Sequence, residues 1–208
     1  SSAEEFKIFE ELKEQIAEVG IELKNNLEVI DVTMSAPTLD DTMPDNERFT
    51  WAVEEVTGMD KIRVPYSVIK KMAHVFRASD FHVKAVIRKT GKDVFVYDVL
   101  PASEEPVVAG IAIDIGTTSV SAIIIDMLNG AVLAKGSAGN GQIRYGADVI
   151  NRIIESGKPG GREKLQDAII KETLNPLILN MCASAKIKPA QVYRLAIGAN
   201  TTMNHLLM

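Results

Sequence analysis

The 208-residue chain is 46% hydrophobic and 25% charged, the balance of a globular protein rather than a disordered one. The net charge is −5 and the Lys and Arg residues are scattered, so the sequence shows no basic patch of the kind that binds nucleic acid. No apolar run approaches the ~20 residues of a membrane span. The single cysteine, Cys182, excludes a disulfide framework and an iron–sulfur cluster held by this chain alone, and it favours the reducing cytoplasm.

The N-terminal segment, residues 1–26, is expected to form an amphipathic helix with a short linker. Apolar side chains recur every three or four positions from residue 3 onward, with Glu and Lys between them. Such a helix needs another surface to pack on. The chain also lacks an initiator Met, so we expect a processed or excised fragment.

The next segment, residues 27–100, is predicted to be a small α+β domain. Apolar periodicity and turn residues place strands at 27–33, 81–88 and 94–100, and helices at 45–56 and from 65 to about 76. Asp45 is a plausible N-cap of the first helix and Gly58 ends it. Trp51 lies between apolar residues of that helix, which predicts a packing anchor.

Residues 101–106 contain two Pro and two Glu and are predicted to be a linker, and residues 107–208 form the second domain. Its strands are expected at 107–115, 119–127, 131–137 and 192–198, and its helices at 146–155, 162–185 and 201–208. Asn129-Gly130 is a strong hairpin signal between the second and third strands. Pro176 should kink the long helix, and Cys182 on the same helix is expected to be buried and inert.

The sharpest chemical feature lies at the turn between the first two strands of this second domain. Gly116 is expected to offer a backbone N–H to a phosphate without a Cβ in the way, and Thr117, Thr118 and Ser119 add hydroxyls and further N–H groups. Asp114, at the end of the buried strand, can hold Mg²⁺ directly or through water. A strand follows the turn, so the motif differs from the Walker A and Rossmann patterns, in which a helix follows.

Other polar residues have an ordinary explanation beside a functional one. Asn200 and Thr201 lie between a strand and a helix, where they could cap the helix, line a phosphate-binding cleft, or do both. Arg144 could reach a phosphate or a partner, although most loop arginines are simply solvated. The histidines share no metal-ligand spacing and are expected at the surface or in packing: His74, His82 and His205.

Asp-x-Gly-Thr-Thr on a hairpin resembles the first phosphate motif of the superfamily that joins sugar kinases, heat-shock chaperones and actin. Three longer runs, residues 110–122, 140–153 and 196–207, resemble the reductive activators of corrinoid proteins, ATPases that carry an iron–sulfur cluster. Residues 37–41 and 45–48 resemble the small domain that precedes the ATPase domain in that family. The resemblance covers roughly residues 27–208.

The resemblance implies a fold and an activity. The fold is a small α+β middle domain followed by the first half of an actin-like, ribonuclease H-like α/β ATPase domain. The activity is ATP-dependent reduction of Co(II) to Co(I) in a corrinoid protein that serves methyl transfer, with the electron coming from a cluster outside these residues. Asp114 is carried over as the catalytic and Mg²⁺-binding residue, and the ATP-binding residues are Gly116, Thr117, Thr118, Ser119, Asn200 and Thr201.

The second half of the ATPase domain is absent from this sequence, so we expect weak nucleotide binding and no independent hydrolysis. A face left open by truncation could allow homodimers. Two other functions remain: a sugar or acyl kinase of the same superfamily, for which no convincing catalytic base is visible, and a nucleotide-regulated docking module. Neither nucleic acid nor a membrane is expected as a partner.

Overall fold

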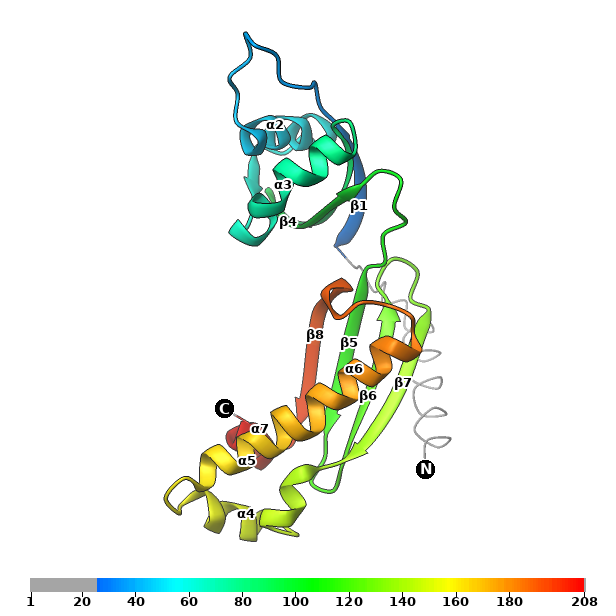
Figure 1. Cartoon of the computed structure of the whole chain (residues 1–208). Coiled ribbons are helices and arrows are strands. Elements are labelled where there is room, and N and C mark those ends of the chain that lie inside the picture. The colour runs from blue at the N-terminus through cyan, green and yellow to red at the C-terminus, as the bar shows by residue number, and fades with distance from the viewer. Residues whose placement is uncertain (1–25, 208) are drawn as a thin grey trace.

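The computed structural model describes residues 26–207, which fold into two units lying end to end (Figure 1). Each unit is built on a four-stranded sheet flanked by helices. Within the described part of the chain, no helix has the length and apolar character needed to cross a membrane. The helix expected in residues 1–26 lies outside the described residues, apart from Asn26.

The first unit has a mixed sheet in the order β1-β3-β4-β2. Strands β1–β3 and β3–β4 pair antiparallel, whereas β2 runs parallel to β4. Helices α2 and α3 pack on this sheet around a core that includes Phe49, Met72 and Phe76. In chain order the elements are β1 (Leu27–Thr33), α2 (Asp45–Thr57), β2 (Lys61–Arg63), α3 (Tyr66–Ala78), β3 (His82–Thr90) and β4 (Asp93–Pro101).

Helix α2 differs from its sequence prediction at two positions. Its N-cap is Pro44, not Asp45, and Asp45 is the first helical residue, where its carboxylate accepts a 2.7 Å hydrogen bond from Arg77 of α3. Trp51 is 57% exposed, so the prediction of a packing anchor is wrong. Gly58 ends the helix as expected, with φ of 68° in the left-handed region that glycine tolerates.

The second unit has a sheet in the order β7-β6-β5-β8. Strands β5, β6 and β7 form an antiparallel meander, and β8 returns parallel to β5 after a helical crossover. The elements follow the predicted order of three strands, helices and a fourth strand. The strands are β5 (Ala109–Ile115), β6 (Ser119–Asp126), β7 (Val132–Gly139) and β8 (Val192–Ala199).

Helices of the second unit cover one face of its sheet, as α5 and α6 do in Figure 1. Alternation along β5 turns Ile111, Ile113 and Ile115 into this core and leaves Ala112 and Asp114 exposed on the other face. Cys182 is buried as predicted, and burial raises the pKa of its thiol. The helical segments are η1 (Gly141–Tyr145), α4 (Val149–Ser156), α5 (Gly161–Ile169), η2 (Ile170–Leu174), α6 (Asn175–Ser184), η3 (Pro189–Gln191) and α7 (Thr201–Leu207).

The long helix expected at residues 162–185 is divided into α5 and α6 by a π-helical turn, η2, which ends two residues before Pro176. Pro176 has no N–H to donate within the helix, so the regular ladder cannot pass through it unchanged. The N–H of Asn175 instead donates to the carbonyl of Ile170, five residues back. Short π turns of this kind recur at functional sites, and this one supports the candidate site described below.

The two units meet in a small apolar cluster centred on Leu27, Val86 and Val108. Beside it, the Tyr193 hydroxyl of β8 donates a 2.9 Å hydrogen bond to the Asp98 carboxylate of β4. Asp98 also forms an ion pair with Lys71 of α3. The contact between the units therefore combines apolar packing with a polar link that depends on one tyrosine hydroxyl.

We expect Tyr193→Phe to lower the free energy of unfolding by about 1–2 kcal/mol at pH 7.5, because a hydrogen bond to a carboxylate is lost. Burial, and then the Asp98 carboxylate, raise the pKa of Tyr193. A raised folded-state pKa means that the tyrosine's contribution is complete below its unfolded value of about 10 and falls as pH rises further. Urea unfolding should therefore show a wild-type advantage that shrinks above about pH 10.

The exposed Tyr66 provides the control for this pair of measurements, since Tyr66→Phe removes a hydroxyl that has no hydrogen bond within residues 26–207. An advantage of wild type over Tyr193→Phe that stays constant from pH 7.5 to 10.5 would contradict the assignment of this hydrogen bond.

Candidate phosphate-binding site

The turn that joins β5 to β6 lies at the far end of the second unit from the first unit (Figure 1). The last paired residues before it are Ile115 and Val120, whose side chains are buried. Thr118 and Ser119 are exposed, and Thr117 is half-buried. The predicted phosphate residues therefore lie together on a short, surface-accessible hairpin whose base is anchored in the core.

Gly116 has a different role from the predicted one. Its N–H donates to the carbonyl of Ser119 at 2.9 Å and closes the turn, so it is not a free phosphate donor. A Cβ at this position would lie 2.8 Å from the same carbonyl oxygen. The N–H groups of Thr117 and Thr118, in contrast, donate to no group within residues 26–207 and remain available to an anion.

Gly116→Ala should therefore distort the hairpin and lower the free energy of unfolding by about 1–3 kcal/mol. Gly139, which pairs with Ser119 on β7, is the matched control because a Cβ there would meet nothing within 4 Å. Urea unfolding of both alanine variants measures the difference. Equal stability of Gly116→Ala and Gly139→Ala would contradict the requirement for glycine at the turn.

Three consecutive carbonyls of the hairpin are hydrogen-bonded from behind by buried donors. The Asn140 amide nitrogen donates to the Gly116 carbonyl at 2.9 Å, and its backbone N–H donates to the Thr118 carbonyl at 2.8 Å. Between them, Nη2 of Arg152 donates to the Thr117 carbonyl at 2.6 Å. With its carbonyls fixed on one side, the turn has little freedom to change the direction of its N–H groups.

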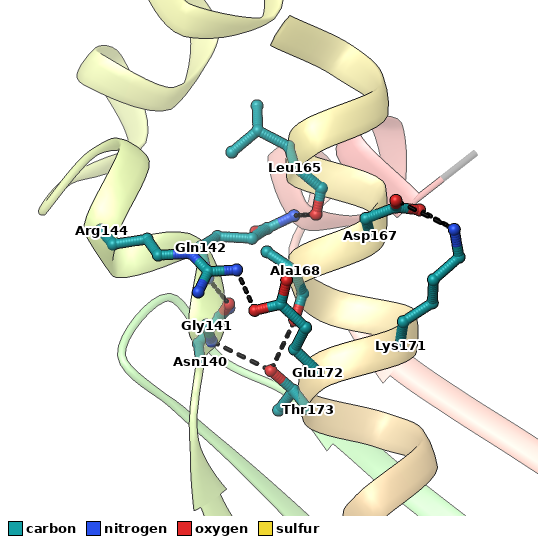
Figure 2. A network of polar contacts seen from close by, with 10 residues as sticks. All are labelled: Asn140, Gly141, Gln142, Arg144, Leu165, Asp167, Ala168, Lys171, Glu172 and Thr173. Atoms are coloured by element: carbon teal, nitrogen blue, oxygen red, sulfur yellow. Dashed lines mark hydrogen bonds and ion pairs between the residues drawn. The ribbon is translucent and has the colours of Figure 1, made fainter.

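The loop that supplies the two Asn140 donors, residues 140–146, is itself anchored on the helices, as Figure 2 shows. Gln142 donates through Nε2 to the Leu165 carbonyl at 3.0 Å. The Gly141 N–H donates to Thr173 Oγ1 at 3.0 Å, and that hydroxyl donates to the Ala168 carbonyl at 2.8 Å.

Thr173 belongs to the π turn, so this irregular turn supplies the hydroxyl that receives the loop. Arg144, one of the loop residues considered for phosphate binding, forms an ion pair with Glu172 at the surface. It lies on the π-turn side of the loop and is given no part in the phosphate site.

Asn200 and Thr201 lie beside the hairpin because the parallel strands β5 and β8 end together. Asp114 is in register with Gly198, and the next residue on each strand is also paired. Asn200 Oδ1 accepts the Met203 N–H at 2.9 Å, so it caps α7 as one interpretation expected. Its Nδ2 lies 3.4 Å from Thr117 Oγ1, so the same side chain also contacts the hairpin, and Thr201 is exposed at the first position of α7.

Asp114 is exposed on the sheet face opposite α5 and α6, at the carboxyl end of β5. Within residues 26–207 no hydrogen bond or ion pair occupies its carboxylate. On the adjacent strand its neighbours are Ala196 and Gly198, which leave space beside it. A free carboxylate next to phosphate donors suits Mg²⁺, which prefers carboxylate oxygen and retains several waters.

No group of three or more His, Cys, Asp or Glu side chains among the described residues is arranged to hold a metal ion. A Mg²⁺ ion at Asp114 would therefore take most of its ligands from phosphate oxygens and water, as is usual for nucleotide-bound Mg²⁺.

Sequence reasoning missed the buried residues that support the hairpin: Asn140, Arg152 and Thr173. Arg152 lies in α4 between apolar residues, and periodicity predicts the apolar side of such a helix to face inward. The structure shows the reverse, with Ile150, Ile153 and Ile154 exposed and Arg152 fully buried. A usable signal would have been Gly146, six residues before Arg152, where a Cβ would lie 2.9 Å from the Arg152 side chain.

Comparison with known proteins places these features in a family. The sequence model of the RACo linker region matches residues 16–106, and that of the RACo middle region matches residues 109–208. The segment that we expected to be the middle domain, residues 27–100, thus matches the linker region. The middle-region model matches the second unit, which contains the 116–119 hairpin.

A curated relative from Eubacterium limosum, "Corrinoid activation enzyme RamQ", is 36% identical over 145 residues, which are 69% of this chain and 24% of the relative. The solved structure of a "Reductive activator for corrinoid, iron-sulfur protein" matches with a TM-score of 0.71 and 31% identity, covering 89% of this chain and 29% of that one. The chain thus spans about a quarter of the length of the curated relative. With a linker-region match, a middle-region match and this fold, the chain belongs to the RACo family of reductive corrinoid activators.

Proposed function

We propose that this chain supplies the first half of the nucleotide site of an ATP-dependent activator that reduces Co(II) to Co(I) in a corrinoid protein of a methyl-transfer system. The relatives' names support reductive corrinoid activation. The observation that carries the nucleotide part is the hairpin, where free N–H groups, hydroxyls and an open carboxylate lie at the carboxyl end of two parallel strands.

The proposed roles of the residues follow from their positions. The N–H groups of Thr117 and Thr118 and the hydroxyls of the hairpin bind phosphate oxygens. Asp114 holds Mg²⁺, which neutralises phosphate charge when bound. Asn200 orients the Thr117 hydroxyl through the contact between its amide and Oγ1, and Thr201 adds a hydroxyl from the start of α7. The adenosine contacts would come from outside these residues.

The residues of this chain do not fit an iron–sulfur cluster. Clusters of this kind are held by several Cys thiolates, and the sequence contains one cysteine, which is buried in the core. In this proposal the electron donor therefore lies outside these 208 residues, and the part assigned to this chain is nucleotide binding and the conformational response to it.

A nucleotide titration of the ¹⁵N-labelled chain tests the site. Mg-ATP should shift the amide resonances of Thr117, Thr118 and Thr201 and leave those of the first unit unchanged. Because this proposal gives the chain only half of the cleft, we expect a dissociation constant of about 0.1–1 mM, which is a binding free energy of about −5.5 to −4 kcal/mol. Asp114→Asn should weaken binding of Mg-ATP but not of ATP with EDTA.

Two results would refute this account of the site. Amide shifts confined to some other surface would remove the hairpin from nucleotide binding. Sub-micromolar affinity of this chain for ATP would show that its nucleotide site is already complete.

A further inference from the structure

Arg152 is a buried cation whose hydrogen-bond partners are all neutral. Its side chain is fully buried, and its Nε donates to the Gly146 carbonyl at 2.8 Å. Nη2 donates to the Thr117 carbonyl at 2.6 Å, and Nη1 lies 3.4 Å from both the Gln142 side-chain oxygen and the Met203 sulfur.

No carboxylate within residues 26–207 forms an ion pair with Arg152. Glu155, three residues on, pairs with Lys158. Asp148 forms no ion pair with Arg152, and its two carboxylate oxygens accept the backbone N–H and side-chain amide of Asn151. Burial lowers the pKa of the Arg152 guanidinium and Asp148 raises this pKa through space to a smaller extent, yet an arginine stays protonated in proteins. A positive charge without an ion-pair partner therefore lies directly behind the hairpin.

Within residues 26–207, α4 buries its arginine and leaves its three isoleucines exposed. Ile150, Ile153 and Ile154 are 65%, 49% and 58% exposed, while the arginine between them is turned inward. Hydrophobic burial alone would orient the helix the other way. Gly146 permits this arrangement, because a Cβ there would lie 2.7 Å from the Arg152 backbone nitrogen.

We infer that Arg152 is a positioning residue that fixes the 116–119 hairpin in its phosphate-binding shape and whose charge strengthens the attraction of this hairpin for a triphosphate. This inference rests on the proposed nucleotide site. The carbonyl of Thr117 points to the guanidinium, so the opposite side of that peptide faces the anion. A bound triphosphate would supply the negative charge that the interior lacks.

The test compares three variants of the 208-residue chain. Arg152→Met removes the charge and the donors, whereas Arg152→Lys keeps the charge and loses the planar set of donors. Arg162→Met removes an exposed positive charge at the start of α5 and serves as the control. Two quantities are measured by NMR: amide hydrogen exchange without ligand, and affinity for inorganic tripolyphosphate with Mg²⁺.

Exchange reports the positioning role. The Gly116 and Asn140 amides, which donate to carbonyls of the hairpin, should exchange at least about tenfold faster in both Arg152 variants, relative to the amide of Ile113 within β5. Affinity reports the charge. Tripolyphosphate should bind Arg152→Met at least about tenfold more weakly than wild type. Its affinity for Arg152→Lys should lie between those for Arg152→Met and wild type, because the lysine keeps the charge.

The outcomes separate the inference from the proposed function. Unchanged hairpin exchange in folded Arg152→Lys or Arg152→Met overturns the positioning role, and equal affinities of the two variants overturn the charge role. If Arg152→Met fails to fold, Arg152→Lys still decides the positioning role by exchange, and Arg152→Gln, which lacks the charge but keeps an amide donor, replaces Arg152→Met in the affinity comparison. Absence of tripolyphosphate binding by wild type refutes the phosphate site and the charge role, while the exchange measurement still decides the positioning role.

Discussion

In a full-length activator that contains these residues, Asp114→Ala should slow ATP-dependent formation of Co(I) by about a hundredfold or more. A nucleotide-bound Mg²⁺ contributes several kcal/mol of charge stabilisation, and Asp114 is the exposed carboxylate at the hairpin that can hold it. The alanine removes an exposed side chain at the end of β5, so the unit should remain folded.

The measurement follows the corrinoid absorbance under anaerobic conditions with a low-potential reductant and Mg-ATP. Asp167→Asn is the control, since Asp167 is an exposed residue of α5 that forms an ion pair with Lys171 of η2. The control should reduce cobalt at the wild-type rate. Wild-type activity of Asp114→Ala would show that this carboxylate has no part in nucleotide use.

The second large effect concerns the first unit, where Phe76→Ala should lower the free energy of unfolding by about 3–5 kcal/mol. Phe76 is fully buried and packs between Phe49 and Phe81, with ring centroids 5.7 and 6.3 Å away. A unit of this size has a small core and marginal stability, so such a loss should leave it largely unfolded near 37 °C.

Circular dichroism during urea unfolding measures this loss, with Trp51→Ala as the matched aromatic control. Trp51 is more than half exposed, so its removal should change the free energy of unfolding by less than about 0.5 kcal/mol. Equal destabilisation by the two substitutions would contradict the arrangement of this core.

Most strands, and the hairpins between consecutive strands, were predictable because alternation and turn chemistry are local. Alternating apolar residues placed β5 and β6, and Asn129-Gly130 marked the hairpin that follows, where Gly130 has φ of 76°. Strand β2, which has three residues and no such pattern, was missed because only its pairing with β4 defines it.

The helices were harder because packing overrode their periodicity. Nothing local shows that Trp51 faces solvent, since its neighbours Phe49 and Val53 are fully buried on the same helix. Pro176 predicts an irregularity in this helix, but the sequence does not show its form, a π turn whose Thr173 hydroxyl accepts the Gly141 N–H. α4 is the extreme case, with its arginine inward and its isoleucines exposed.

The hairpin residues were found from the sequence because glycine, threonine and aspartate at this spacing are chemically distinctive. The residues that support the hairpin were not found from the sequence, because Asn140 and Arg152 are distant in sequence from the turn and contact it only in the fold. The N–H of Gly116 was expected to bind phosphate for a different reason: the sequence did not show that the turn closes with this N–H donating to Ser119.

The most direct test of the proposed function is the ATP dependence of cobalt reduction by a full-length activator that contains these residues. A Co(II) corrinoid protein and a low-potential reductant are mixed anaerobically with the activator, and the corrinoid spectrum is followed with and without Mg-ATP. The account predicts conversion to Co(I) only when Mg-ATP is present. No conversion, with ATP consumed only after a sugar or an acyl compound is added, would contradict it and show a small-molecule kinase instead.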